Sequence, residues 1–140
     1  MNNIELTSLE KEVLKWLLAG KDPVLIALET QMKKASKIRR EFTGHGFYLY
    51  FIFSSTIQAI HKELPVKADF FFGDVEAIIP SLNYGAGFLL WVKNGVVICL
   101  EGYTYDETWP KEIKEFTLRY ISGFDRDWNK LREQWQQKRE

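Results

Sequence analysis

Residues 85–103, GAGFLLWVKNGVVICLEGY, set the architecture of this chain. Two apolar runs, residues 88–92 and 96–100, flank the dipeptide Asn94-Gly95. Both central residues of a type I′ turn need positive φ, which Asn tolerates and Gly adopts without steric cost. The sequence therefore predicts a β-hairpin with a two-residue turn at Asn94-Gly95.

An uninterrupted hairpin with this turn has a fixed strand register. The predicted cross-strand pairs are Lys93 with Val96, Trp91 with Ile98, Leu89 with Leu100 and Phe88 with Glu101. Glu101 therefore shares a face with Phe88, and both faces of the hairpin are apolar. Such a hairpin lies in the middle of a sheet that is covered on both sides, or covered on one side with a sticky second face.

The composition fits one domain, residues 1–140, with a mass of 16.5 kDa and room for a hydrophobic core. The hydrophobic share of 46% and the charged share of 27% are those of an ordinary globular chain. The aromatic share of 15% is high and requires a large core or an aromatic contact surface. The net charge is zero, so no overall field attracts nucleic acid or an acidic membrane.

Cys99 is the only cysteine, which excludes an intramolecular disulfide and disfavours a thiolate zinc site. It lies in an apolar run, as expected for a buried, inert thiol. The first residues lack the basic segment and apolar core of a signal peptide, and the apolar runs are too short to span a bilayer. We therefore expect a cytoplasmic protein without a membrane span.

Three helices are predicted from capping residues and apolar spacing. The first starts at a capping box, in which the Thr7 hydroxyl accepts from the Glu10 amide while the Glu10 side chain reaches back. Asp22-Pro23 starts the second helix, and Asp125 caps the third. The predicted buried stripes are Leu9, Val13, Trp16 and Leu17, then Leu25, Leu28, Met32 and Ala35, and finally Trp128, Leu131 and Trp135.

Six segments have the composition or the alternation of β-strands. They are residues 36–42, 47–54, 68–75, 88–92, 96–100 and 116–121. Gly73-Asp74 can end or bulge the third segment, and the last one also fits a helix, although we favour a strand. The sum is an α+β domain: an antiparallel sheet of five to six strands with an N-terminal helical hairpin and a C-terminal helix.

Glu41, Asp74 and Glu101, together with His45, are the candidate catalytic residues. A carboxylate whose pKa is raised by burial can act as a general base, and two carboxylates at a suitable separation support acid–base hydrolysis. His45 lies between two glycines of a turn, where it is either an exposed turn residue or a proton shuttle beside Glu41. The alternative for these carboxylates is a structural ion pair.

Arg40 is a candidate binding residue, because its parity with Ile38 points it toward the core. A guanidinium that points coreward needs a carboxylate partner. Glu101 is the predicted partner, and Asp74 and Glu76 compete for the same role.

Three tryptophans are further candidate binding residues. Trp109 adjoins Asp106 and Glu107, and these acidic residues can contact a basic partner. Trp128 and Trp135 either pack against the core or form an aromatic patch that suits a dimer or a protein partner.

One basic cluster lies where the second helix meets the first strand: Lys33, Lys34, Lys37, Arg39 and Arg40. Such a cluster can bind RNA phosphates while nearby tyrosines stack on bases. A solvated rim explains the same charges, and we favour it over a nucleic-acid site.

No signature of a cofactor or metal occurs, since the glycine pairs at 44–46 and 85–87 do not open a helix and the two histidines lack a carboxylate at ligand spacing.

Four strings resemble a group of small, uncharacterised bacterial proteins: LTSLEKEVLKWLLAG (residues 6–20), REFTGHGF (40–47), GDVEA (73–77) and LEGYTYDETWP (100–110). The resemblance covers nearly the whole chain. It implies a single bacterial cytoplasmic domain and carries no activity, ligand or site residue.

The favoured interpretation is a non-enzymatic protein-binding module of the bacterial cytoplasm, of the kind that neutralises a toxin or regulates a partner, such as an immunity protein or antitoxin. It rests on the aromatic, two-faced sheet, the neutral charge and the missing catalytic signatures. A protein partner or a second copy of the chain would bind it, without cofactor, metal or membrane. The alternative is a small hydrolase or ligand-binding enzyme that uses the three carboxylates with His45, and RNA binding through residues 33–40 is a third interpretation.

Overall fold

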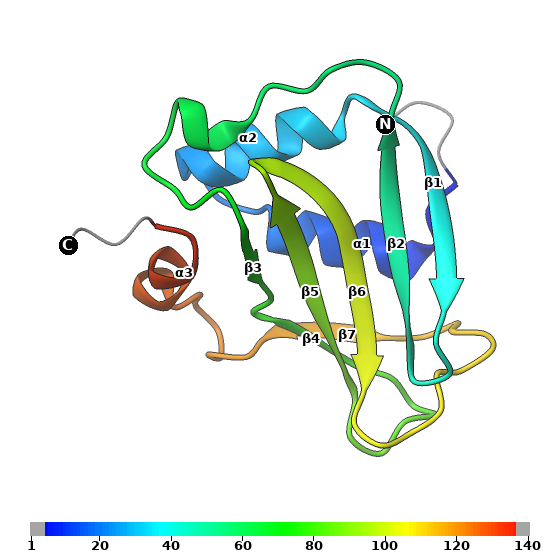
Figure 1. Cartoon of the computed structure of the whole chain (residues 1–140). Coiled ribbons are helices and arrows are strands. Elements are labelled where there is room, and N and C mark those ends of the chain that lie inside the picture. The colour runs from blue at the N-terminus through cyan, green and yellow to red at the C-terminus, as the bar shows by residue number, and fades with distance from the viewer. Residues whose placement is uncertain (1–4, 137–140) are drawn as a thin grey trace.

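The computed structural model describes residues 5–136. It confirms the predicted α+β fold, an antiparallel sheet with a helical hairpin at the N-terminus of the described chain and a helix at its C-terminus (Figure 1). The elements in chain order are α1 (Ser8–Leu17), α2 (Pro23–Met32), β1 (Ala35–Phe42), β2 (Gly46–Phe53), the 3-10 helix η1 (Ile60–Lys62), β3 (Phe70–Phe72), β4 (Val75–Ile78), β5 (Ala86–Lys93), β6 (Val96–Thr104), β7 (Thr117–Tyr120) and α3 (Trp128–Trp135).

The sheet has seven strands in the order β1-β2-β6-β5-β4-β7, with β3 also paired to β5. The predicted number of five to six strands is too small, because residues 68–75 do not form one continuous strand. Gly73 and Asp74 separate β3 from β4. At Gly73 an added Cβ would lie 1.7 Å from the Phe88 carbonyl oxygen, so only glycine allows the two backbones to pass this closely. The segment predicted as a strand at 116–121 is β7.

The central hairpin has the predicted turn but not the predicted register. Asn94 and Gly95 both have positive φ, 52° and 74°. A bulge at Ile98 then shifts the pairing, so that Leu90 faces Leu100 and Leu89 faces Glu101. Because side chains alternate between the two faces, one extra residue moves every later side chain of β6 to the opposite face. The prediction that Glu101 shares a face with Phe88 is therefore wrong.

The two N-terminal helices cover one face of the sheet. Figure 1 shows α1 and α2 behind β2, β5 and β6, with α3 to the side of β3. On the central strands, the side chains of the covered face are buried and include Leu49, Phe72, Phe88, Leu90, Val97 and Leu100. Gln31 of α2 is also buried, and it accepts a hydrogen bond from the Val97 amide (2.9 Å) and donates one to the Gly95 carbonyl (2.8 Å). These two bonds fix α2 on the turn of the hairpin.

The helix caps follow the sequence with one exception. Thr7 and Glu10 form the predicted capping box, and Asp22 caps α2 through the Val24 amide (3.0 Å). Asp127, not Asp125, caps α3, because its carboxylate accepts from the Lys130 amide (3.1 Å). The predicted start of the third helix is therefore two residues too early.

Candidate binding site on the open face of the sheet

We call the side of the sheet away from α1 and α2 the open face, because within residues 5–136 no helix lies over its central strands (Figure 1). Its side chains alternate along the strands with buried neighbours and, apart from the buried Cys99, are themselves half-buried or exposed. They come from β2, β3, β5 and β6 and include Tyr48, Tyr50, Phe71, Leu89, Trp91, Glu101 and Tyr103. The open face therefore joins a mostly aromatic surface to one carboxylate.

Glu101 lies at the centre of the open face. Tyr48 and Leu89 flank it on the two neighbouring strands, and its Oε1 accepts a hydrogen bond from Trp91 Nε1 (3.0 Å). The bond fixes the orientation of the indole, which is otherwise free to turn about its side-chain torsions.

The negative charge of the Glu101 carboxylate raises the pKa values of neighbouring side chains. Its charge is the main reason that the pKa of Tyr48 is raised. Burial first and the Glu101 charge second raise the pKa of the Cys99 thiol to about 11. Burial is also the main reason that the pKa of Tyr103 rises to about 12, with smaller contributions from Tyr105 and Glu101. Three neighbours therefore register the same negative charge.

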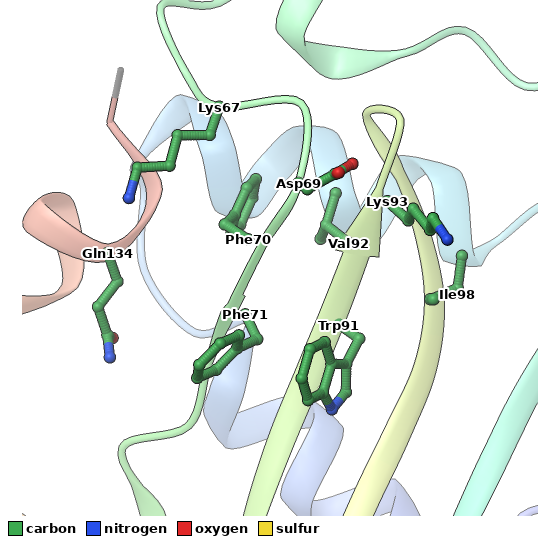
Figure 2. Close-up of a pocket in the computed structure, with 9 residues that line it drawn as sticks. All are labelled: Lys67, Asp69, Phe70, Phe71, Trp91, Val92, Lys93, Ile98 and Gln134. Atoms are coloured by element: carbon green, nitrogen blue, oxygen red, sulfur yellow. The ribbon is translucent and has the colours of Figure 1, made fainter. Parts of the chain in front are cut away.

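A groove of about 620 Å³ borders the open face and extends from β6 across β5 and β3 to α3 (Figure 2). Phe71, Trp91 and Ile98 form an apolar part of its lining, and the Phe71 and Trp91 rings lie 4.6 Å apart. Lys67 and Lys93 also line the groove, as do Asp69, Phe70, Val92 and Gln134. The volume and the apolar lining are those of a site that accepts a small ligand or one or two side chains of a partner.

The four candidate catalytic residues do not come together. Asp74 is held on the side of α1 and α3 by Arg126, with Nε–Oδ2 and Nη2–Oδ1 distances of 2.8 and 2.9 Å. His45 lies in the β1–β2 turn, where its Nδ1 is 3.0 Å from the Glu107 carbonyl oxygen. Glu41 and Glu101 share the open face but lie on β1 and β6, with β2 between them. The pocket that the hydrolase interpretation requires is therefore not formed by these residues.

Arg40 points coreward as predicted, but its partner is not Glu101. It forms a two-pronged ion pair with Glu10 of α1, with distances of 2.8 and 2.7 Å. The hydrogen bond to Glu10 raises the pKa of Arg40 further. Glu101 is out of reach because the bulge at Ile98 places it on the other face of the sheet. Arg40 therefore holds α1 to β1.

The three candidate tryptophans differ in exposure. Trp135 is 1% exposed and packs edge-on against Phe72 at 5.4 Å, so it belongs to the core and cannot contact a partner. Trp109 is half-buried and lies edge-on to Phe47 at 5.1 Å. Trp128 is half-buried beneath the guanidinium of Arg126. None of the three lies on the open face.

The basic cluster at residues 33–40 is largely neutralised. Lys33 pairs with Glu29 (3.2 Å), Arg39 with Glu41 (3.2 Å) and Arg40 with Glu10 (2.7 Å). The charges available for RNA phosphates are therefore fewer than the sequence indicates.

No sequence pattern indicates the role of Arg126, which precedes α3 and joins the end of α1 to Asp74, the residue before β4. It pairs with Asp74 and also donates to the carbonyls of Leu17 (3.0 Å) and Ala19 (2.7 Å) at the end of α1. Its partners lie 52 to 109 residues away, and no local pattern marks them. The groove did leave a signal, because Phe71 and Trp91 have the parity opposite to the buried stripe of their strands.

No protein-family model, curated protein or solved structure matches this sequence. The resemblance to small bacterial proteins stays a prediction. Within the described residues, no group of three metal-ligating side chains lies close enough to hold an ion. Among residues 5–136 no helix has the length and apolar character needed to cross a bilayer.

Proposed function

We propose that this chain is a non-enzymatic protein-binding module of the bacterial cytoplasm, and that its open face contacts the partner. The observation that carries the proposal is the row of aromatic side chains on the open face. Within residues 5–136 no helix lies over the central strands of this face (Figure 1). Phe71 is 44% exposed there, although it stands next to the buried Phe72. Aromatic residues are enriched in protein interfaces, because they bury a large area for few rotatable bonds.

The groove beside Trp91 supports the same proposal. Hot spots of interfaces are apolar or aromatic anchors that fill a pocket on the partner, and a groove of about 620 Å³ can receive one. The hydrogen bond from Trp91 to Glu101 keeps the wall of the groove in place before a partner arrives. Immunity proteins and antitoxins act in this manner, by occupying a partner rather than by chemistry.

A different protein fits the open face better than a second copy of this chain. A twofold dimer with its axis at the centre of the open face would bring two Glu101 carboxylates together, and like charges in an interface oppose association. The edge strand β1 is also a poor site for strand addition, because Lys37, Arg39 and Glu41 all line it. We therefore propose a heterologous complex.

The test compares two exposed apolar residues on opposite sides of the molecule. The partner is first recovered from extracts of the chain's own cells, and its affinity for purified variants is then measured by calorimetry. Phe71→Ala on the open face should weaken binding by at least about tenfold, the loss expected of an interface anchor. Ile26→Ala is the matched control, since Ile26 is 53% exposed on α2, behind the sheet.

Two results would contradict the proposal. One is a strictly monomeric chain that recovers no partner from its own cells. The other is a partner whose affinity falls as much with Ile26→Ala as with Phe71→Ala. Both variants should unfold at nearly the denaturant concentration of the wild type, so that a loss of fold cannot imitate a loss of contact.

A further inference from the structure

Three carboxylates lie on strands of the open face, and two of them have an arginine partner. Glu41 of β1 pairs with Arg39 (3.2 Å), and Glu76 of β4 pairs with Arg119 of β7 (2.5 Å). The third is Glu101, which has no Lys or Arg partner within residues 5–136. Among these three strand carboxylates, the central one is therefore the one without a cation.

The chain itself shows how this surface binds a guanidinium. The Arg39 guanidinium lies 4.3 Å from the centre of the Tyr50 ring while it pairs with Glu41. An aromatic face and a carboxylate thus act on the same cation, which adds a cation–π attraction to the ion pair.

Glu101 has the same kinds of group around it. Tyr48 faces it across β2, Tyr103 lies two residues further along β6, and Trp91 donates its indole N–H to the carboxylate. Trp91 provides the aromatic face that attracts cations best. Trp91 and the Tyr48 hydroxyl both interact with the carboxylate, but an ionised carboxylate has about four acceptor sites and so keeps capacity for a donor from outside.

We propose that Glu101, with Trp91, Tyr48 and Tyr103, binds a basic side chain of the protein partner, arginine in preference to lysine. This inference rests on the proposed function, because it names the chemistry that the partner presents to the open face. Arginine is preferred because its planar guanidinium stacks on an aromatic ring and donates two parallel hydrogen bonds to one carboxylate.

The experiment uses the whole chain and two small probes, N-acetyl-arginine amide and its neutral isostere N-acetyl-citrulline amide. The readout is the NMR resonance of the Trp91 indole N–H, which Trp91→Phe identifies among the five tryptophans. The arginine derivative should shift this resonance in a saturable manner. The citrulline derivative, which has nearly the same shape but no charge, should bind about tenfold more weakly or not at all.

Two carboxylate variants locate the site. Glu101→Gln keeps an oxygen that can accept from Trp91 but removes the charge, and it should abolish the preference for arginine over citrulline. Glu76→Gln is the matched control, because that carboxylate lies on the same side of the sheet and already has Arg119. It should leave the arginine affinity unchanged.

The inference is overturned if the arginine derivative causes no saturable shift, if citrulline binds equally well, or if the two variants lower the arginine affinity alike. The comparison of the two probes uses the wild-type chain, so it holds even if Glu101→Gln fails to fold. If the arginine derivative binds at Glu101 but Phe71→Ala does not change the affinity for the partner, only the proposed function is contradicted. If Phe71→Ala weakens the partner complex but the arginine derivative does not bind, only the cation site is contradicted.

Discussion

The two faces of the central strands differ in how deeply their side chains are buried. On the covered face of β2, β5 and β6, side chains such as Leu49, Leu90 and Leu100 are completely buried under α1 and α2. On the open face, Tyr50, Leu89 and Trp91 of two of these strands remain half-buried. The covered face supplies the apolar burial that drives folding, whereas the open face carries apolar area that folding leaves in contact with water.

The ion pairs on the two sides differ in the same way. Arg126 and Asp74 are nearly enclosed, with side chains 4% and 17% exposed, and Arg126 also donates to the carbonyl of Leu17 in α1 and that of Ala19 just after it. Arg119 and Glu76 form a pair on the outer side, where the arginine side chain is 59% exposed. Removing one partner of an enclosed pair leaves a buried charge unpaired and lowers stability by several kcal/mol. An exposed pair is screened by water, so its loss lowers stability little.

The largest expected effect comes from breaking the enclosed pair. Arg126→Met should lower the free energy of unfolding by about 4 kcal/mol, because it leaves the Asp74 carboxylate and the carbonyls of Leu17 and Ala19 without their donor. Arg119→Met should cost less than about 1 kcal/mol. Urea titrations of both variants measure the two values. Equal losses would show that enclosure is not what separates the pairs.

The next effect compares adjacent leucines of β5. Leu90→Ala removes a side chain that is fully buried under the helices and should cost about 3 kcal/mol of unfolding free energy. Leu89→Ala, on the open face, should cost about 1 kcal/mol of unfolding free energy. Its loss of partner-binding free energy should exceed this loss of stability. Urea unfolding and partner affinity, measured on both variants, check this. A Leu89 variant as unstable as the Leu90 variant would mean that the open face belongs to the core.

The smallest effect concerns Cys99, the thiol beneath the rings of the open face. Its pKa is raised from 9.0 to about 11, so at pH 8.5 the folded chain has about a hundredfold less thiolate than the unfolded chain. Alkylation by iodoacetamide should be slower by at least that factor in buffer than in urea. Glu101→Gln should speed the reaction of the folded chain by less than tenfold, because burial is the larger cause of the shift.

The same shift gives a dependence of stability on pH. The folded chain favours the neutral thiol, so the contribution of Cys99 is complete below about pH 9 and is lost as the pH rises through about 11. Stability in urea should therefore decline over this alkaline range, and less so in Cys99→Ala after correction for its own stability. Equal alkylation rates in buffer and urea would remove the basis of both expectations.

Much of the fold was predictable because the signals are local. The Asn94-Gly95 turn, the capping box of Thr7 and Glu10, and the buried Leu25, Leu28 and Met32 of α2 each depend on residues only a few positions apart. Ala35, predicted to extend this stripe, begins β1 instead. The candidate site was predictable only in part. Residues of both hairpin faces are apolar, so alternation identified a second face but could not tell which side the helices cover.

The bulge at Ile98 shows why the site itself needed the tertiary structure. Val97 and Leu100 are three positions apart and lie on opposite faces of a regular strand, yet both are buried under the helices. Only an extra residue between them brings both to the covered face, and the same residue turns Glu101 to the open face. In a strand that is apolar on both sides, the gain from packing under α2 fixes the position of the bulge, and no local pattern records it.

Composition, turn and caps thus fixed the class of fold, the sequence positions of most helices and strands, and the presence of an aromatic surface. Tertiary contacts alone paired Arg40 with Glu10 and Asp74 with Arg126, and left Glu101 among the rings of the open face. Turns and helix caps depend on contacts within about four residues, and residues this close in sequence are also close in space. Ion pairs between distant segments depend on which face each strand presents, and one inserted residue reverses that choice.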